Sequence, residues 1–289
     1  MDLTLFPLRI IHDGGPRISP AVIEGNYMQV QSFPSNGTRP FILNVPSAMR
    51  ATLSRPSVQP PNFGLTRGAP PMRRLSRRGG APSLHGHFSG TSKALAAVPF
   101  ESLLERDFLT LLEADASIRS YAVQAHRLIY PAVDKHGRVR DHVYTPDFVA
   151  EDREGRVIVM EVKARGISRM ERWRRMEPFI RLAYEELGVI YRVFTEETVR
   201  IQPRLSNCEI MLAHGRVKLD HGAEILVRRA ISELPKVFRL EDLYERTSAS
   251  TSLDQDQIFN TAMHLALRGV IKLDLSKPLS KMTASISVH

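Results

Sequence analysis

The chain has 289 residues, of which 43% are hydrophobic and 25% charged, as expected for a globular protein with one large or two smaller domains. No apolar run approaches the roughly 18 residues of a membrane helix. The single cysteine, Cys208, excludes a disulfide framework, an iron–sulfur cluster and a multi-cysteine zinc site. We therefore expect a cytoplasmic protein that does not contact a membrane.

The net charge of +9 is concentrated at the start of the chain. Residues 1–90 contain 10 Lys and Arg against 3 Asp and Glu, together with 12 of the 19 prolines and 10 of the 17 glycines. This composition predicts a disordered extension over 1–90. Its basic run at 73–78 is either an arm for DNA or a partner, or a solvated tail. Met72 is an alternative start, in which case 1–71 do not belong to the protein.

Hydrophobic periodicity predicts the first ordered elements after the extension. Apolar residues at helical spacing indicate a helix over 100–114. β-Branched and alternating stretches indicate strands, and an arginine-rich stretch indicates a second helix. The expected strands are 127–133, 142–150, 156–163 and 189–195, with the second helix at 168–187. This order predicts an α/β domain over 91–204 with a mixed sheet flanked by helices.

The last third of the chain has a different pattern. Helices are expected over 222–234, 240–246 and 252–267, followed by a short strand over 270–275. Ser252 and Gln255 have the spacing of a capping box at the start of the last helix. Three helices followed by a strand are similar to a winged helix, so we expect a small winged-helix-like domain over 205–289.

The candidate chemistry lies around the strand 156–163. Alternation along a strand places Glu161 and Lys163 on one face, at the end of an otherwise apolar segment. A buried carboxylate and ammonium are costly unless they are paired or bind something. If Asp147 ends a neighbouring strand, the carboxylates converge beside the lysine and provide the oxygen ligands that Mg²⁺ prefers. The lysine can then orient or deprotonate a water, or stabilise charge on a phosphate.

The specificity of this pattern comes from the combination of its parts. A Glu-x-Lys triplet alone occurs often by chance, and its structural alternative is a surface ion pair at a strand end. A Pro-Asp on one strand followed by Glu-x-Lys on the next is much rarer, and it is the arrangement of the PD-(D/E)xK nucleases. A third acid is expected from the first helix, where Glu101 and Glu105 share one side. Asp115, just past this helix, is a weaker candidate as a ligand of a second ion.

These residues resemble the TnsA endonuclease subunit of heteromeric transposases, a member of the restriction-endonuclease-like PD-(D/E)xK superfamily. The resemblance covers about 72–285 and rests on the following segments: 85–93, 100–113, Gln124, 145–148, 161–163 and 266–275. It implies that the catalytic residues are Glu105, Asp147, Glu161 and Lys163. Glu105 is the glutamate from the helix, for which Glu101 is the second choice, and Lys163 is the motif lysine. It also implies metal ligation by Glu105, Asp147, Glu161 and the carbonyl of Val162.

The family resemblance also implies a function. Such a subunit hydrolyses phosphodiesters with Mg²⁺, or Mn²⁺ in its place, at the 5′ ends of a mobile element in double-stranded DNA. A TnsB-like transposase cuts the 3′ ends, and a TnsC-like AAA+ ATPase binds the C-terminal domain. The alternatives are a stand-alone nuclease of the same fold in repair or restriction, and a DNA-binding scaffold subunit without catalysis.

An arginine cluster follows the motif lysine on the second expected helix. Its members are Arg169, Arg172, Arg174 and Arg175. They are candidates for contacts with DNA phosphates beside the cleft. The structural alternative is an ordinary exposed helix face that pairs with Glu171 and Glu177.

Overall fold

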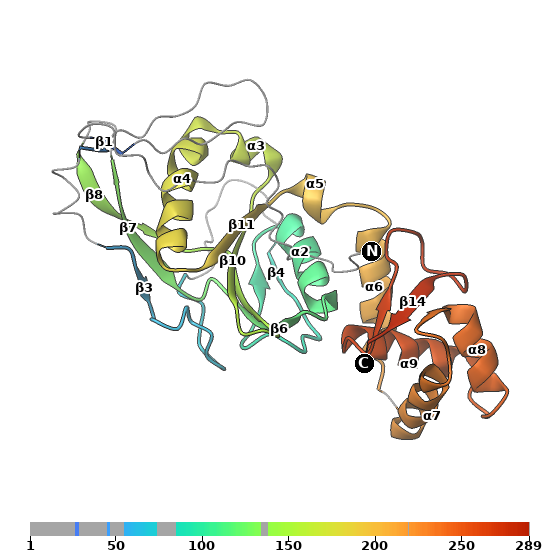
Figure 1. The fold of residues 1–289 in the computed structure, drawn as a ribbon. Coiled ribbons are helices and arrows are strands. Elements are labelled where there is room, and N and C mark those ends of the chain that lie inside the picture. The colour runs from blue at the N-terminus through green and yellow to red at the C-terminus, as the bar shows by residue number, and fades with distance from the viewer. Residues whose placement is uncertain are drawn as a thin grey trace.

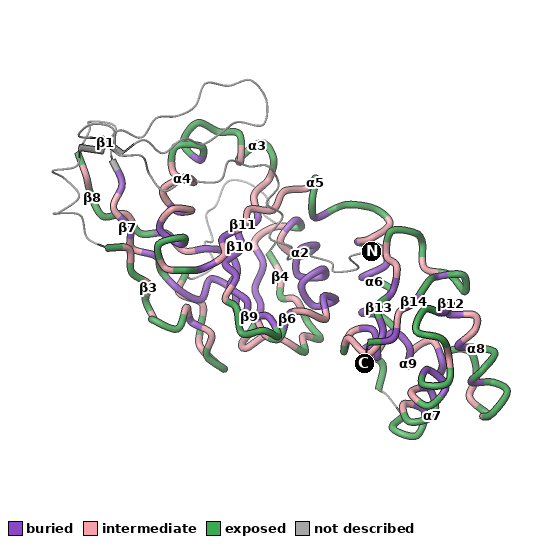
Figure 2. The backbone as a smooth tube through the Cα atoms, viewed as in Figure 1, coloured by how far each residue is buried: buried purple, intermediate pink, exposed green. Residues whose placement is uncertain are grey.

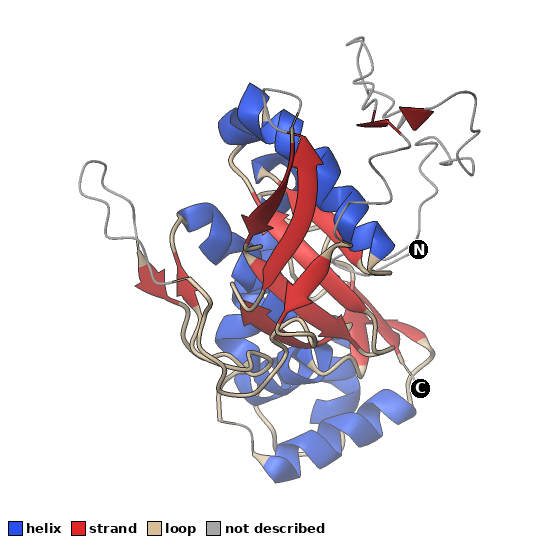
Figure 3. Ribbon diagram, turned by 90° about the vertical axis from the view of Figure 1, so that its left-hand side faces the viewer, coloured by secondary structure: helices blue, strands red, loops and turns tan. Residues whose placement is uncertain are grey.

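The computed structural model describes residues 27–28, 45–46, 55–73, 85–133, 138–218 and 220–288. The expectations for the other residues, including most of the basic run at 73–78, lie outside this part of the chain. The protein is α/β, as predicted, with several sheets and with helices labelled α2 to α9 (Figures 1 and 3). The first described strands, β1 (Tyr27–Met28) and β2 (Val45–Pro46), form an antiparallel pair.

A four-stranded mixed sheet organises the first half of the fold. Its strands, in spatial order, are β11 (Ile190–Phe194), β10 (Val157–Val162), β9 (Phe148–Asp152) and β6 (Ile118–Val123). The β10–β11 pair is parallel, while β9 pairs antiparallel with both β10 and β6. The alternating hydrophobic faces of 156–163 thus belong to a central strand that is covered on both sides.

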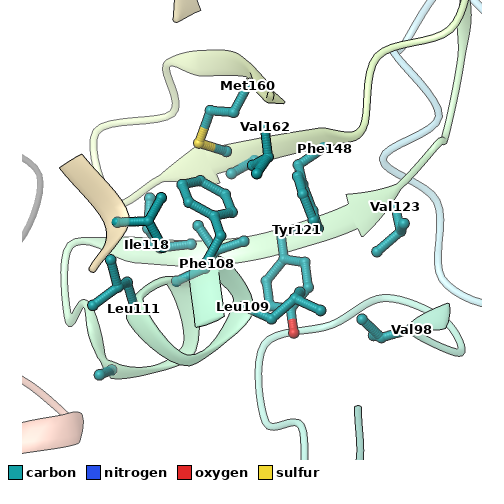
Figure 4. Packing of buried hydrophobic residues seen from close by; sticks show 14 of the residues in the cluster. Val98, Phe108, Leu109, Leu111, Ile118, Tyr121, Val123, Phe148, Met160 and Val162 are labelled. Carbon is teal, nitrogen blue, oxygen red and sulfur yellow. The ribbon is translucent and has the colours of Figure 1, made fainter. Parts of the chain in front are cut away.

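Helices cover the two faces of this sheet. On one face, α2 (Leu103–Ala114) packs Phe108 against Phe148 and Met160, in the cluster shown in Figure 4. On the other face, α4 (Glu171–Glu186) packs Trp173 and Tyr184 with a second buried cluster. Side chains alternate along β10 as expected, because Ile158, Met160 and Val162 belong to the first cluster and Val159 to the second. The buried segments run along the sheet in Figure 2.

A second sheet lies at the α4 side of the domain. Its order is β3 (Ser57–Gln59), β7 (Arg127–Val133) and β8 (Val139–Tyr144), all antiparallel. The hairpin-like pair β4 (Gly86–His87) and β5 (Pro99–Phe100) leads into α2. Residues 55–73, which composition assigns to the extension, are therefore folded against the domain through β3.

The expected strand 142–150 is wrong as a single element. The structure divides it into β8 and β9, which belong to different sheets, with Thr145, Pro146 and Asp147 between them. Pro146 has no N–H to give to a sheet, and the N–H of Asp147 donates to the Glu161 carboxylate at 3.1 Å instead of to a strand. The chain leaves one sheet and enters the other at this point, which places Asp147 at the start of β9.

The expected helix 168–187 is also divided. A short helix, α3 (Arg165–Ser168), precedes α4. After β11 the chain forms α5 (Glu196–Val199) and then α6 (Arg204–Gly215), a helix that hydrophobic periodicity did not predict.

The C-terminal part has three further helices and a small sheet. The helices are α7 (His221–Ser232), α8 (Leu240–Ser248) and α9 (Gln255–Leu267). The sheet has the order β12 (Val237–Arg239), β14 (Ala284–Ser287) and β13 (Ile271–Leu273). The capping box lies two residues later than predicted, because Asp254, not Ser252, accepts from Gln257 N–H at 2.8 Å. Among the described residues, no helix is long and apolar enough to cross a membrane.

Candidate active site

Asp147, Glu161 and Lys163 lie together at one end of the central sheet. Asp147 immediately precedes β9. Glu161 is the second-last residue of β10, and Lys163 directly follows that strand. The Lys163 ammonium forms an ion pair with Glu161 and lies 3.7 Å from Asp147 Oδ2. Strand alternation and the antiparallel β9–β10 pairing together produce this convergence, since the start of β9 meets the end of β10.

The backbone fixes the two carboxylates relative to each other. Asp147 Oδ2 accepts a hydrogen bond from Val162 N–H at 2.9 Å, and Glu161 Oε2 accepts from Asp147 N–H at 3.1 Å. Each acid therefore binds the main chain next to the other acid. This reciprocal arrangement holds the carboxylates in place through the main chain.

Glu161 has a further donor that the sequence did not reveal. The Tyr144 hydroxyl, at the end of β8, donates a short hydrogen bond to Glu161 Oε2. Glu161 is only 1% exposed, so each of these donors offsets part of the cost of burying its charge. No local pattern indicates Tyr144, because it reaches the site from the second sheet.

Glu105, rather than Glu101, is the helix acid whose charge interacts with Asp147 and Lys163. Burial, and then the charge of Asp147, raises the pKa of Glu105 to about 7, and Glu105 is also among the charges that raise the pKa of Lys163. Glu101 forms an ion pair with Arg73 instead. Glu105 also has a structural role, since its Oε2 accepts from Glu101 N–H at 2.9 Å and its own N–H donates to the Ser102 hydroxyl at the start of α2.

Electrostatics at the site follow from burial and crowding of like charges. Burial, followed by repulsion from Asp147, raises the pKa of Glu161 above the ordinary range of a glutamic acid. Burial opposes the charge of Lys163, yet Asp147 and Glu161 raise the pKa of its ammonium. The ammonium also lies 5.2 Å from the centre of the Trp173 ring, a distance at which a cation is attracted to an aromatic face.

The donor chemistry of the site fits a hard divalent cation. Mg²⁺ is commonly held by one or two carboxylates and keeps several waters, and Asp147 and Glu161 supply this pair. Among the described residues, no three His, Cys, Asp or Glu side chains stand close enough to hold a metal ion by themselves. The charge of Glu105 interacts with that of Asp147, but Glu105 does not complete a compact set of three ligands. The expected ligation by the Val162 carbonyl stays a prediction.

Asp115, the weaker candidate for a second ion, lies elsewhere. It follows the last residue of α2, at the other end of the helix from Glu105. Its Oδ1 accepts from the backbone and hydroxyl of Ser117 at 2.8 and 2.7 Å. Its role in the structure is to end the helix.

The arginine cluster follows the lysine in the chain: Arg169 lies between α3 and α4, and the other three arginines lie on α4. Arg169, Arg172, Arg174 and Arg175 are all exposed. Arg175 pairs with Glu171, whereas the other three have no carboxylate partner among the described residues. Arg172 and Arg174 flank the buried Trp173, which contacts Lys163. The exposed cations therefore border the candidate site.

No protein-family model matches the chain, and no curated protein matches it.

Proposed function

We propose that this protein is a Mg²⁺-dependent DNA endonuclease, with Mn²⁺ as an alternative ion. The observation that carries the proposal is the convergence of Asp147, Glu161 and Lys163 where β9 begins and β10 ends. A buried acid pair with a fixed ammonium is the set of groups that phosphodiester hydrolysis requires. A mixed sheet with α2 and α4 on its faces supports a restriction-endonuclease-like domain, and the three helices and sheet after 220 support a winged-helix-like one.

The chemistry can be stated for the residues of the site. A bound Mg²⁺, held by Asp147 and Glu161 with Glu105 and the Val162 carbonyl nearby, would polarise the phosphate and lower the pKa of a bound water. The oxygen of such a water would bond to phosphorus as the P–O3′ bond breaks. The water would release a proton to solvent and the 3′ oxygen would take one up, which leaves a 5′-phosphate and a 3′-hydroxyl. The Lys163 ammonium donates hydrogen bonds to the attacking water or to a phosphate oxygen, and thereby stabilises the developing charge.

The exposed arginines on α4, with Arg169 just before it, suit contacts with DNA. Arg169, Arg172, Arg174 and Arg175 would neutralise backbone phosphates on the side of the site that Lys163 faces. Such contacts position DNA without reading its sequence. They are consistent with a subunit whose specificity comes from partners.

The biological setting we propose is a heteromeric transposase. In it this chain nicks the non-transferred strand at the 5′ ends of a mobile element, beside a TnsB-like transposase, and binds a TnsC-like AAA+ ATPase through its C-terminal domain. This part of the proposal rests on the family resemblance of the motifs.

Metal binding and DNA nicking test the enzymatic core of the proposal. Asp147→Asn keeps an oxygen for Val162 N–H and removes the charge, so it should weaken Mg²⁺ binding by about 10- to 100-fold and reduce nicking of supercoiled DNA in parallel. Asp256→Asn, an exposed change on α9, is the matched control and should behave as the wild type. Calorimetry that detects no Mg²⁺ binding to the wild-type protein would favour a scaffold role.

A further inference from the structure

Residues 55–73, which we call the strap, cross the edge of the domain next to the candidate site. The strap begins with β3, which pairs with β7 from Ser57 opposite Ile129 to Gln59 opposite Arg127. Val58, Phe63 and Leu65 then pack against the buried cluster beneath α4. The strap ends at Met72 and Arg73, both of which contact residues close to the candidate site.

The strap surrounds the turn formed by Gln124, Ala125 and His126. The Phe63 carbonyl lies 3.1 Å from His126 Nδ1, and Met72 N–H donates to the Gln124 carbonyl at 2.8 Å. Between these contacts, Gly64 lies against the middle of the turn: a Cβ at this glycine would be 2.0 Å from the Ala125 carbonyl oxygen.

The turn itself has a strained backbone. Gln124 has a φ of +48°, a left-handed conformation that costs energy in a residue with a side chain. Gln124 is 3% exposed, and its Oε1 has no hydrogen-bond partner among the described residues. Such a conformation persists only where its surroundings impose it, and the strap supplies these surroundings on one side.

The other side of the turn leads directly to Asp147. Gln124 N–H donates to the Asp147 carbonyl at 2.8 Å, so the turn and the catalytic aspartate share one backbone hydrogen bond. Any shift of the turn would therefore move the main chain that carries the Asp147 carboxylate.

A chain of buried polar groups links the turn to Glu161 as well. His126 Nε2 lies 2.8 Å from the Tyr184 hydroxyl, and the Tyr184 ring stacks on Tyr191 at 5.3 Å. The Tyr191 hydroxyl lies 3.5 Å from that of Tyr144, which donates to Glu161.

A third contact reaches the helix acid. Arg73, the last residue of the strap, forms an ion pair with Glu101. The backbone N–H of Glu101 donates in turn to Glu105 Oε2 at 2.9 Å. The strap thus contacts residues that bond to Asp147 and Glu105 directly. It reaches Glu161 only through the side chains from His126 to Tyr144.

We propose that the strap is a positioning element of the active site, which sets the carboxylates in the geometry that binds the metal ion. This inference rests on the proposed endonuclease function. The strap lies mostly outside the region that resembles the transposase subunits, and a chain that began at Met72 would lack β3 and the contacts with Ala125 and His126.

Two glycines of the strap provide a matched pair of variants. Gly64 and Gly68 have φ values of +73° and +78°, so alanine is strained to a similar degree at both. Only at Gly64 does a new Cβ collide with the turn, because the Cβ position at Gly68 meets no described atom within 4 Å. Gly64→Ala therefore displaces the turn, and Gly68→Ala controls for the backbone cost.

The decisive readout is the Mg²⁺ concentration that gives half-maximal nicking by the full chain. We expect Gly64→Ala to raise it by about 10-fold or more, as a disturbed supporting contact does for a metal site, and Gly68→Ala to leave it within a factor of about two. A loss of folded protein alone would lower the amplitude of nicking without moving this concentration. An unchanged Mg²⁺ dependence in folded Gly64→Ala overturns the proposal.

If Gly64→Ala does not fold, Tyr184→Phe takes its place. It removes the hydroxyl that bonds His126 and keeps the ring that stacks on Tyr191. Tyr130→Phe is its control, since the Tyr130 hydroxyl makes no hydrogen bond among the described residues. A raised Mg²⁺ requirement in Tyr184→Phe but not in Tyr130→Phe supports the positioning role of the strap. An equal Mg²⁺ requirement in the two variants overturns that role.

Hydrogen exchange separates this proposal from the proposed function. The amides of Asp147 and Val162 donate to Glu161 and Asp147, so faster exchange of both in Gly64→Ala than in Gly68→Ala supports the strap even if the protein never cuts DNA. In that case the endonuclease function fails and the positioning role stands. Equal amide exchange and an equal Mg²⁺ requirement in Gly64→Ala and Gly68→Ala overturn the positioning role of the strap. If the wild type still nicks DNA in that case, the proposed endonuclease function stands.

Discussion

Glu161 is buried among donors that come from three parts of the chain. Its Oε2 accepts from the Tyr144 hydroxyl and the Asp147 amide, and its Oε1 pairs with Lys163. Strand periodicity predicts that Glu161 and Lys163 share a face, because that relation is local. It cannot predict Tyr144, since the contact depends on how the second sheet meets the first.

The Tyr144 hydroxyl should contribute measurably to stability. Tyr144→Phe leaves the buried Glu161 carboxylate short of one donor, which we expect to lower the free energy of unfolding by about 1–3 kcal/mol. Urea denaturation measures this difference, and Tyr130→Phe is again the control. Equal losses in the two variants would show that the bond to Glu161 adds no stability.

His126 makes stability depend on pH. Burial lowers its pKa to about 4, although the bond to the Phe63 carbonyl opposes the shift. Because the ordinary pKa of histidine is about 6.5, the unfolded state binds the proton more readily. The stability contributed by neutral His126 is therefore present above about pH 6.5 and is lost as the pH falls toward 4, by up to roughly 3 kcal/mol.

The matching measurement compares the wild type with His126→Asn from pH 7 to 5. Asn keeps a donor for the Phe63 carbonyl but does not titrate in this range. We expect the wild type to lose more free energy of unfolding over this interval than the variant does. Parallel curves would mean that folding does not lower the pKa of His126.

At the scale of elements, α2 is fixed at both ends by side chains of residues that precede it in the chain. Ser102 accepts from Glu105 N–H at its start. At its end, Lys93 Nζ donates to the carbonyls of Glu113 and Asp115 at 2.7 and 2.6 Å, groups that no turn of helix can satisfy. The orientation of α2, and with it that of Glu105, depends on these contacts.

Lys93→Met should therefore destabilise the domain. The buried carbonyls at the end of α2 lose their donor, and we expect a loss on the order of 2 kcal/mol. Lys236→Met, at an exposed position before β12, should change stability little. A thermal unfolding midpoint that is the same for both variants would show that water replaces the ammonium without cost.

The elements that sequence patterns miss share a physical cause. Hydrophobic periodicity locates β7, β10, β11 and α9 well, because each has an amphipathic or continuous apolar pattern of its own. It joins β8 to β9, since the intervening Asp147 is buried by tertiary contacts and not by strand pairing. It misses β3 because composition alone suggests disorder, whereas β3 is ordered by its pairing with β7.

At the scale of the whole molecule, α6 connects the two parts. Leu205, Cys208 and Leu212 pack in the cluster that contains α2, while Met211 packs in the cluster of the C-terminal part. Asn207 also donates to the Lys277 carbonyl at 2.7 Å. The expected boundary at 204/205 falls at the first turn of this shared helix, so the two parts are packed together and not only tethered.

This shared helix predicts a single unfolding transition. Trp173 fluorescence reports the first part of the chain, and far-ultraviolet circular dichroism reports the whole. Both probes should give the same midpoint. Leu212→Ala should lower both midpoints together, with a loss of about 2–4 kcal/mol, whereas Leu226→Ala at a more exposed position should not. Two separate midpoints, with only the Trp173 transition moving in Leu212→Ala, would show that the parts unfold independently.

We propose that the Asp147, Glu161 and Lys163 cluster cuts one DNA strand at the ends of a mobile element. The direct test is a strand-resolved cleavage assay with the full chain, Mg²⁺, DNA that carries the element ends, a TnsB-like transposase and a TnsC-like AAA+ ATPase. We predict 5′ nicks on the non-transferred strand that disappear in Lys163→Ala. Cutting of the 3′ ends by the transposase without 5′ nicks, or 5′ nicks that persist in Lys163→Ala, would contradict the claim.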